Sequence, residues 1–188
     1  MKKIILTVFA ASSLLLYSTP SFALLSFSVG MPLSHTITGK MKGGEKIEPD
    51  GVSGTFIQIG VPVLPGIGID SYKTKIKANA GNDNIAHDLS TTIYNLYYLL
   101  PIPIINLSVG AGIGTTEYRC VVCESIFEKG MASQWYASFG IPIIPLFDLH
   151  VSYRSISAKN IKWKTGPYTG QKEDNSGSVI GVGVMFSF

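Results

Sequence analysis

The sequence predicts an all-β protein: an eight-stranded antiparallel up-and-down transmembrane barrel, preceded by a cleaved signal peptide. Three observations carry this prediction. Apolar and polar residues alternate with a period of two, short proline turns alternate with long polar loops, and the chain is poor in charge. Of the 188 residues, 46% are hydrophobic and only 14% are charged, whereas soluble domains carry roughly 25% charged residues. This length allows a single domain.

The first 23 residues have the three parts of a secretory signal peptide. Two lysines begin it, residues 4–16 form an apolar core, and Ser21 and Ala23 are the small residues of a cleavage site. We expect cleavage after Ala23, which leaves a barrel domain of residues 24–188; the alternative is an uncleaved N-terminal anchor. Without the two signal lysines, the 15 Lys and Arg of the chain fall to 13 against 12 Asp and Glu. This near balance predicts no nucleic-acid partner.

Strict alternation of side-chain type defines the strands. In residues 147–155, the odd positions from Phe147 to Tyr153 are apolar and the positions between them are polar or charged. Residues 105–113 and 134–141 alternate in the same way, as amphipathic strands do. The same criterion along the chain predicts eight strands, at about 24–32, 51–62, 65–77, 89–100, 103–117, 132–142, 145–157 and 177–188.

The connections between these strands are of two kinds. Residues 60–65 and 140–145 share the pattern Gly-x-Pro-x-x-Pro, and residues 99–104 form a similar proline pair between them. Because proline stops a strand ladder, each pattern predicts a tight turn. The opposite connections are long and polar, at about 33–50, 78–88, 118–131 and 158–176. An even number of strands with short turns at one end and long loops at the other is typical of an outer-membrane barrel.

The placement of charge distinguishes this barrel from a soluble β-sandwich or lipocalin, whose strands would carry charged side chains on one face. Within the predicted wall, the charged residues are Asp70, Asp148 and Arg154. In a bilayer every backbone N–H and C=O group needs an internal partner, and a closed barrel supplies one. The sequence therefore favours a barrel in a membrane.

The last predicted strand ends in Phe188, with Phe186, Val184 and Val182 on the same face. This end resembles the C-terminal strand of bacterial outer-membrane barrels. The mature chain is similar in architecture to their small eight-stranded class, the OmpA-, OmpX- and opacity-like group. The resemblance implies that Phe188 and Phe186 are read by the barrel-assembly machinery. It also implies a bacterial outer-membrane location with extracellular loops, contact with membrane lipid and lipopolysaccharide, and roles in envelope integrity, adhesion or resistance. It implies no particular activity.

The alternation also places a polar network inside the barrel, whose lumen is about wide enough for side chains to fill. Its charged or titratable members are Asp70, Asp148, His150 and Arg154. Their polar neighbours on the same faces are Gln58, Tyr72, Asn95, Asn106, Ser108, Gln134, Tyr136 and Ser152. Because unpaired buried polar groups are costly, we expect these side chains to hydrogen-bond one another. This arrangement excludes a wide porin and leaves a narrow path open.

Asp148, His150 and Arg154 share one face of one strand, so a catalytic or proton-relay site is an alternative to a structural network. Outer-membrane lipid A deacylases have a His-x-Ser motif that faces lipid near the barrel top. His150 and Ser152 have that spacing, but their parity faces the lumen, close to the turn at Pro145. Catalysis also needs a nucleophile and an open site. We therefore predict no catalytic residues, no cofactor and no enzyme activity.

Two groups of lysines lie at the predicted outer rim, one on the third strand and one after the seventh. The residues are Lys73, Lys75, Lys77, Lys159, Lys162 and Lys164. Lipopolysaccharide phosphates lie at this depth of the outer leaflet, so both groups are candidates for binding lipid phosphates. The alternative is solvated rim charge, because lysines at membrane interfaces commonly extend into water.

Cys120 and Cys123 are the two cysteines of the chain and stand in Cys-Val-Val-Cys within the third long loop. A secreted chain matures in an oxidising compartment, so we predict a disulfide between them. One alternative is a redox pair, for which the thioredoxin-like setting is missing. Another is half of a zinc site completed by His35 and His87 from other outer loops. We predict no bound metal.

Together these features predict a non-enzymatic outer-membrane barrel with a structural, adhesive or ligand-binding role carried by four long extracellular loops. The second hypothesis is a narrow channel for small or apolar solutes, and the third is a lipid-modifying enzyme. The sequence has no nucleotide-binding or metalloprotease motif, and no motif names the surface ligand.

Overall fold

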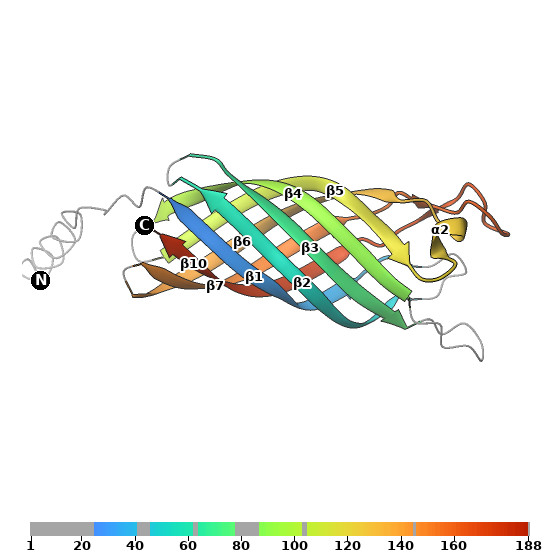
Figure 1. Ribbon diagram of the computed structural model, residues 1–188, viewed down its shortest axis with the longest axis horizontal. Coiled ribbons are helices and arrows are strands. Elements are labelled where there is room, and N and C mark those ends of the chain that lie inside the picture. Colours follow the sequence, from blue (N-terminus) through green and yellow to red (C-terminus); the bar gives the residue numbers. More distant parts are fainter. Residues whose placement is uncertain are drawn as a thin grey trace, which may run out of the picture.

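The computed structural model describes residues 25–40, 46–61, 64–77, 87–102, 105–144 and 146–187. The expected signal peptide and Phe188 lie outside these residues. Within them, eight antiparallel strands form a closed barrel in the order β1-β10-β7-β6-β5-β4-β3-β2. The strands are β1 (Ser26–Ile37), β2 (Glu48–Gly60), β3 (Gly66–Lys77), β4 (His87–Ile102), β5 (Ile105–Arg119), β6 (Gly130–Ile144), β7 (Phe147–Ser157) and β10 (Gly177–Ser187). The predicted fold is therefore confirmed, and Figure 1 shows the tilted strands around the barrel.

The strands extend further toward the long loops than the sequence predicted. β1 continues to Ile37 instead of residue 32, because it pairs with β10 as far as Ile37↔Gly177. β2 begins at Glu48 and β4 at His87, inside segments predicted as loops. These additional residues are mostly polar, so they resemble loop sequence although their backbone remains in the ladder. Among the described residues, no helix is long or apolar enough to cross a membrane.

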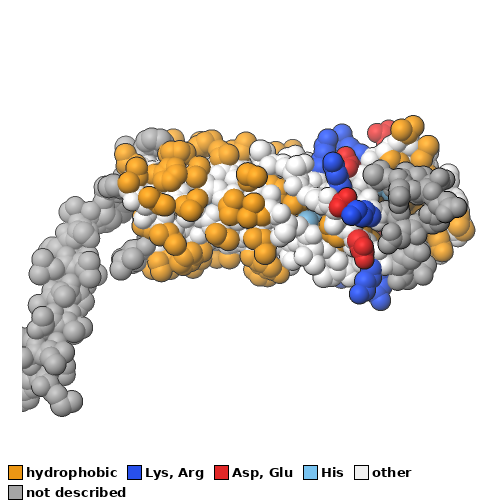
Figure 2. Space-filling model, turned by 90° about the horizontal axis from the view of Figure 1, so that it is seen from below, with side chains coloured by type: hydrophobic (Ala, Val, Ile, Leu, Met, Phe, Trp, Pro, Cys, Tyr) orange, Lys and Arg blue, Asp and Glu red, His pale blue; other side chains and the backbone are white. Residues whose placement is uncertain are grey.

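The outer face of the barrel carries a continuous apolar belt. Its large side chains are exposed on every strand, for example Ile67 on β3, Tyr94 on β4 and Ile113 on β5. On the face seen in Figure 2, hydrophobic side chains gather toward the end with the short turns, and a band of charged side chains lies nearer the loops. Paired aromatic rings belong to the belt, with Trp135 and Tyr153 5.8 Å apart between centroids. An exposed apolar surface this large is expected of a protein that contacts lipid.

The barrel interior changes from polar to apolar toward the loops. All twelve polar positions predicted for the lumen are on the inside: eleven are buried and Asn106 is half-buried. Nearer the loops, an apolar cluster fills the interior. Ile37, Ile76 and Leu89 come from the wall, whereas Ile47 and Ile161 come from the loops. The loops therefore close the barrel at this end.

The third and fourth long loops form one folded unit, which we call the loop cap (residues 120–129 and 158–176). It contains α2 (Cys123–Ile126), β8 (Ile161–Lys162) and β9 (Lys172–Glu173), and β8 pairs with β9. Phe127 bridges Trp163 in the backbone ladder, and their rings lie 4.5 Å apart between centroids. Two backbone hydrogen bonds flank this bridge, from Glu128 N–H to Lys162 O and from Lys164 N–H to Ile126 O. The loop cap is therefore held by both hydrogen bonds and aromatic packing.

One junction in the wall has an incomplete ladder. β1 and β2 pair only from Ser26↔Gly60 to Gly30↔Phe56, although both strands continue toward the loops. Pro32 has no N–H to donate, and β1 shifts register between Pro32 and Ser34. In β2, Gly54 has a φ of +152°, and a Cβ there would meet the Tyr72 backbone at 2.4 Å, so the strand needs glycine. We call this unpaired stretch between residues 31–37 and 48–55 the β1–β2 seam.

Candidate functional site

The middle of the lumen is filled by a cluster that we call the interior plug, formed by Phe56, Asp70, Asn95, Gln134, Tyr136 and Arg154. Arg154 is 1% exposed, and its Nε donates a hydrogen bond to Asp70 Oδ2 at 3.0 Å. Its guanidinium group lies over the Phe56 ring, 3.6 Å from the centroid, and 5.0 Å from that of Tyr136. Burying two charges is costly unless further contacts satisfy them, and the two rings supply cation–π contacts.

Amide side chains complete the plug. Gln134 Nε2 donates to Asp70 Oδ2 at 2.5 Å and to Asn95 Oδ1 at 2.7 Å. Gln58 Nε2 donates to the Tyr136 hydroxyl at 2.7 Å. Together with the Arg154–Asp70 pair, these contacts join β2, β3, β4, β6 and β7 across the lumen. The plug therefore ties distant parts of the wall together.

Nearer the short turns, Asp148 and His150 have separate partners. Asn106 Nδ2 donates to Asp148 Oδ2 at 2.5 Å. The His150 ring lies between two hydroxyl groups, with Nε2 2.9 Å from Ser28 Oγ and Nδ1 2.9 Å from Ser138 Oγ. Asp148 and His150 thus each contact side chains of other strands.

Ser152 completes the comparison with a His-x-Ser motif. Its hydroxyl contacts Arg154 Nη1 and donates to Gly181 O at 3.4 Å. The hydroxyl partners of His150 come instead from β1 and β6. His150 and Ser152 therefore have the spacing of that motif, but their side chains contact different residues.

His35 was predicted to lie in an outer loop as a candidate zinc ligand, and this placement is wrong. It is a buried residue of β1. Its Nδ1 lies 2.7 Å from Thr74 Oγ1, and its ring meets the edge of Tyr72 at 5.8 Å between centroids. The error follows from the boundary of β1, which continues past the residues where the apolar alternation stops.

The predicted disulfide is confirmed, because Cys120 and Cys123 are bonded to each other. His87, the first residue of β4, lies beside them with Nδ1 3.7 Å from Cys123 Sγ. Burial lowers the pKa of His87. Of the two histidines considered from the sequence, the structure brings only His87 to the cysteines.

The lysines of β3 belong to a band of mixed charge. Lys73, Lys75 and Lys77 are exposed on the outside of the barrel. Lys77 Nζ lies 2.8 Å from Asp50 Oδ1, which raises the pKa of Lys77 by hydrogen bonding and charge. Lys75 is opposite Asp88 in the β3–β4 register. Acidic side chains therefore alternate with the lysines, as the band in Figure 2 shows.

The band continues along β5. Glu117 pairs with Arg119 at 2.6 Å and with Lys129 at 3.7 Å. We call this band the charge collar; it runs from β2 to the start of β6 and is made of Asp50, Lys73, Lys75, Lys77, Asp88, Glu117, Arg119 and Lys129. The sequence did not reveal the acidic members as partners, because each lies on a different strand from its lysine or arginine, except Glu117 and Arg119.

The second group of lysines lies in the loop cap, after β7 as the sequence predicted. Lys159, Lys162 and Lys164 are all exposed. Lys164 Nζ donates to Glu124 O at 2.7 Å, so it joins the two loops. Lys162 is opposite Lys172 in the β8–β9 ladder. This group is therefore a cationic surface on the hairpin.

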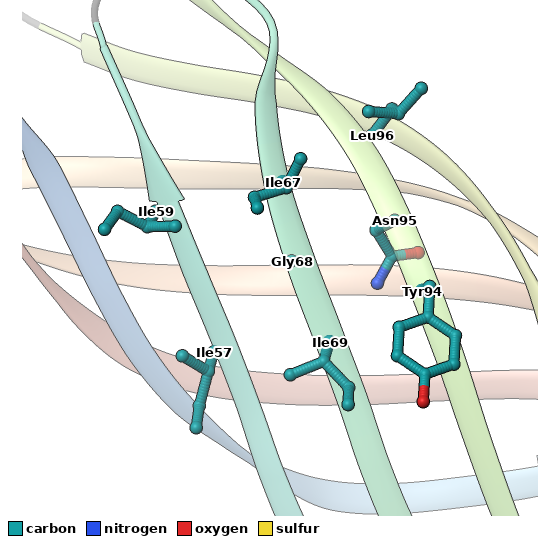
Figure 3. A pocket seen from close by; sticks show the side chains of 8 residues that line it. All are labelled: Ile57, Ile59, Ile67, Gly68, Ile69, Tyr94, Asn95 and Leu96. Carbon is teal, nitrogen blue, oxygen red and sulfur yellow. The ribbon is translucent and has the colours of Figure 1, made fainter.

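Shallow apolar hollows lie on the outside of the described barrel, and two of them involve β2. The first, of about 470 Å³, crosses β2, β3 and β4 and is shown in Figure 3. Side chains of Ile57, Ile67 and Leu96 are among those that line it. The second, of about 610 Å³, lies over the start of the β1–β2 seam and includes Met31 and Val52. Both belong to the apolar belt and suit lipid chains.

No family model and no curated protein matches the chain, whereas solved structures do match it. Outer membrane protein W of E. coli aligns with a TM-score of 0.55 over 89% of this chain and 100% of its own, at 11% identity. The chain has the fold of the small outer-membrane β-barrels. OprG from Pseudomonas aeruginosa aligns with a TM-score of 0.54 over 87% and 95% of the two chains, at 8% identity. AlkL, solved in lipid bilayers, gives 0.55 over 91% and 93%, at 11% identity.

Proposed function

We propose that this protein is a non-enzymatic outer-membrane barrel that binds a partner at the cell surface through its loop cap, with the long loops outside the cell. The observation that carries this proposal is the closed interior. Arg154 and Asp70 are 1% and 0% exposed in the middle of the lumen, and the apolar cluster under the loops closes it again. A lumen filled in this way supports a role at the surface.

The loop cap supplies a surface suited to binding. Its two loops hold each other through backbone pairing and the ring contacts of Phe127, Trp163 and Tyr168. A surface that is already ordered loses less conformational entropy when a partner binds. Between the two cysteines of the disulfide, Val121 is fully exposed, beside the exposed Val122. Exposed apolar side chains gain free energy when a partner covers them.

The charge collar would bind lipopolysaccharide below the loop cap. Lys73 is opposite Ser53 on β2 and Ser90 on β4, so its cross-strand neighbours carry no charge. Lys73 can therefore meet lipid phosphates directly, whereas Lys75 and Lys77 stand beside acidic side chains. The hairpin lysines Lys159, Lys162 and Lys164 add positive charge in the loop cap. Acidic members of the collar would bind phosphates through divalent cations.

Display of the barrel on a non-adherent bacterial host tests the surface role. We expect the host to gain adherence to cultured epithelial cells. Val121→Asp with Val122→Asp should abolish this gain, because both side chains point into solvent and their replacement leaves the wall intact. Lys172→Gln is the control, because it changes an exposed residue of β9 in the same loop cap. Equal adherence of the double variant and the native barrel would contradict the proposal.

A narrow route for small apolar molecules is the second candidate, and the β1–β2 seam favours it. The wall there lacks part of its ladder, and an apolar hollow of about 610 Å³ lies over the same stretch. In planar bilayers and solute-uptake assays, we expect no ion conductance from the native barrel. Uptake of a small apolar solute that is blocked by a disulfide engineered across the seam would support the second candidate over the first.

A further inference from the structure

We propose that the dithiol form of Cys120 and Cys123 binds a divalent zinc ion together with His87. The loop end of the barrel would then hold either a disulfide or a metal at the same place. This inference is independent of the proposed surface role, because it concerns only the chemistry of these three side chains.

The three ligand atoms are already close together. A ring nitrogen of His87 and the two Sγ atoms all lie within 4.8 Å of one another, and Nδ1 is 3.7 Å from Cys123 Sγ. Around a tetrahedral zinc ion, a ligand nitrogen and sulfur lie about 3.6 Å apart and two sulfurs about 3.8 Å apart. The histidine is therefore at a ligand distance from Cys123, and the two sulfurs become free to separate once their bond is reduced.

The strand ladder sets this arrangement. β4 begins at His87 and β5 ends at Arg119, and the register Asp88↔Arg119 brings the two strand ends side by side. Cys120 directly follows Arg119, so the ladder places it next to His87. Cys123 is 1% exposed and is anchored in the apolar cluster under the loops. The three ligands are thus positioned by the barrel and its core instead of by a free loop.

The donor set selects the metal. Two thiolates and one imidazole suit zinc better than magnesium or calcium, which prefer oxygen ligands. The Cys-x-x-Cys spacing is common in zinc sites. Three protein ligands leave the fourth position for water, as in zinc sites that remain open to an added ligand.

The two forms are linked by a balanced exchange. A dithiol reductant gives two electrons and two protons to the Cys120–Cys123 bond and becomes a disulfide itself, and the two cysteines become thiols. Zinc binding then releases the two thiol protons, so that the ion is held by two thiolates and a neutral imidazole. A newly exported chain carries thiols before it is oxidised, and at that stage zinc and disulfide formation compete for the same sulfurs.

Cobalt titration of the folded mature protein in detergent tests this inference. The protein is reduced with a dithiol, which is removed under argon, and Co²⁺ is added as a spectroscopic probe for zinc. We expect one Co²⁺ per barrel, with thiolate charge-transfer and tetrahedral d–d bands that Zn²⁺ displaces. The oxidised protein should show none of these bands. Heat-modifiable gel mobility reports whether each sample is folded.

Variants identify the ligands. His87→Ala should weaken Co²⁺ binding at least tenfold, and Cys120→Ser with Cys123→Ser should remove it. His35→Ala is the matched control, because its ring lies inside the barrel, and it should bind Co²⁺ like the native protein. The proposal is overturned if the reduced protein binds no Co²⁺, if the oxidised protein binds it equally well, or if His87→Ala has native affinity.

Discussion

Replacement of Arg154 by methionine tests how much the interior plug contributes to the free energy of unfolding. Methionine is unbranched and uncharged, so the substitution keeps a flexible apolar side chain in the lumen but removes the guanidinium group that lies over the Phe56 ring. It leaves Asp70, which is 0% exposed, without its cationic partner. Gln134 remains as a neutral donor to the same carboxylate oxygen.

The expected loss is large because the surviving charge stays buried. Removal of one partner from a buried ion pair costs about 3–5 kcal/mol, whereas a solvent-exposed pair contributes about 0–1 kcal/mol. Asp70→Asn should cost a similar amount, since it leaves the Arg154 guanidinium unpaired. The double variant, which removes both charges, should be more stable than either single variant. Such a recovery isolates the interaction between the two side chains.

Equilibrium unfolding by guanidinium in phospholipid vesicles, followed by tryptophan fluorescence, measures these free energies. Lys73→Met is the control, because it removes a charge that has serine neighbours across the ladder on the exposed surface. It should change stability by less than about 0.5 kcal/mol. If Arg154→Met lies within about 1 kcal/mol of the native barrel, Asp70 is not held in a closed interior, and the argument for a filled lumen fails.

Three further predictions concern assembly, the wall and the disulfide. Deletion of Phe188 should severely lower the amount of protein in the outer membrane while refolding in detergent survives; unchanged surface abundance in cells would refute this. Val151→Arg, in the apolar belt of β7, should cost about 2–4 kcal/mol of unfolding free energy in vesicles, and Val121→Arg in the loop cap should cost little. Equal costs would contradict the assignment of the belt. Cys120→Ser with Cys123→Ser should leave a folded barrel by gel mobility and loosen the third loop, seen as faster proteolysis there; a barrel that no longer folds would show that the ladder depends on this bond.

Local sequence determined the number of strands and which side chains face inward. A strand turns each successive side chain to the opposite face, so the assignment of Gln58, Asn95 or Arg154 to the interior required no knowledge of the neighbouring strands. The tight turns follow from proline for the same reason, because its effect on the ladder is local. The disulfide was also predictable, since its two cysteines are three residues apart and no other thiol exists in the chain.

Tertiary structure decided which of these side chains meet. Arg154 contacts Asp70, 84 residues away, because barrel closure and the stagger of the strands bring β7 and β3 to the same depth of the lumen. The acidic partners of the β3 lysines come from β2 and β4 for a similar reason. Asn175 shows that a loop residue can also depend on a distant partner: it is 1% exposed and accepts a hydrogen bond from the Tyr118 hydroxyl at 2.6 Å.

The positions of the histidines show the same division between local and long-range information. The sequence treated His35 and His87 alike, as polar residues between apolar strands. The β1–β10 ladder extends past His35 and turns it inward, whereas the β4–β5 register brings His87 to the cysteines. Above the apolar belt, a strand no longer needs outward apolar residues, so its end is determined by hydrogen bonds to neighbours far away in the chain. Those partners exist only once the barrel has closed.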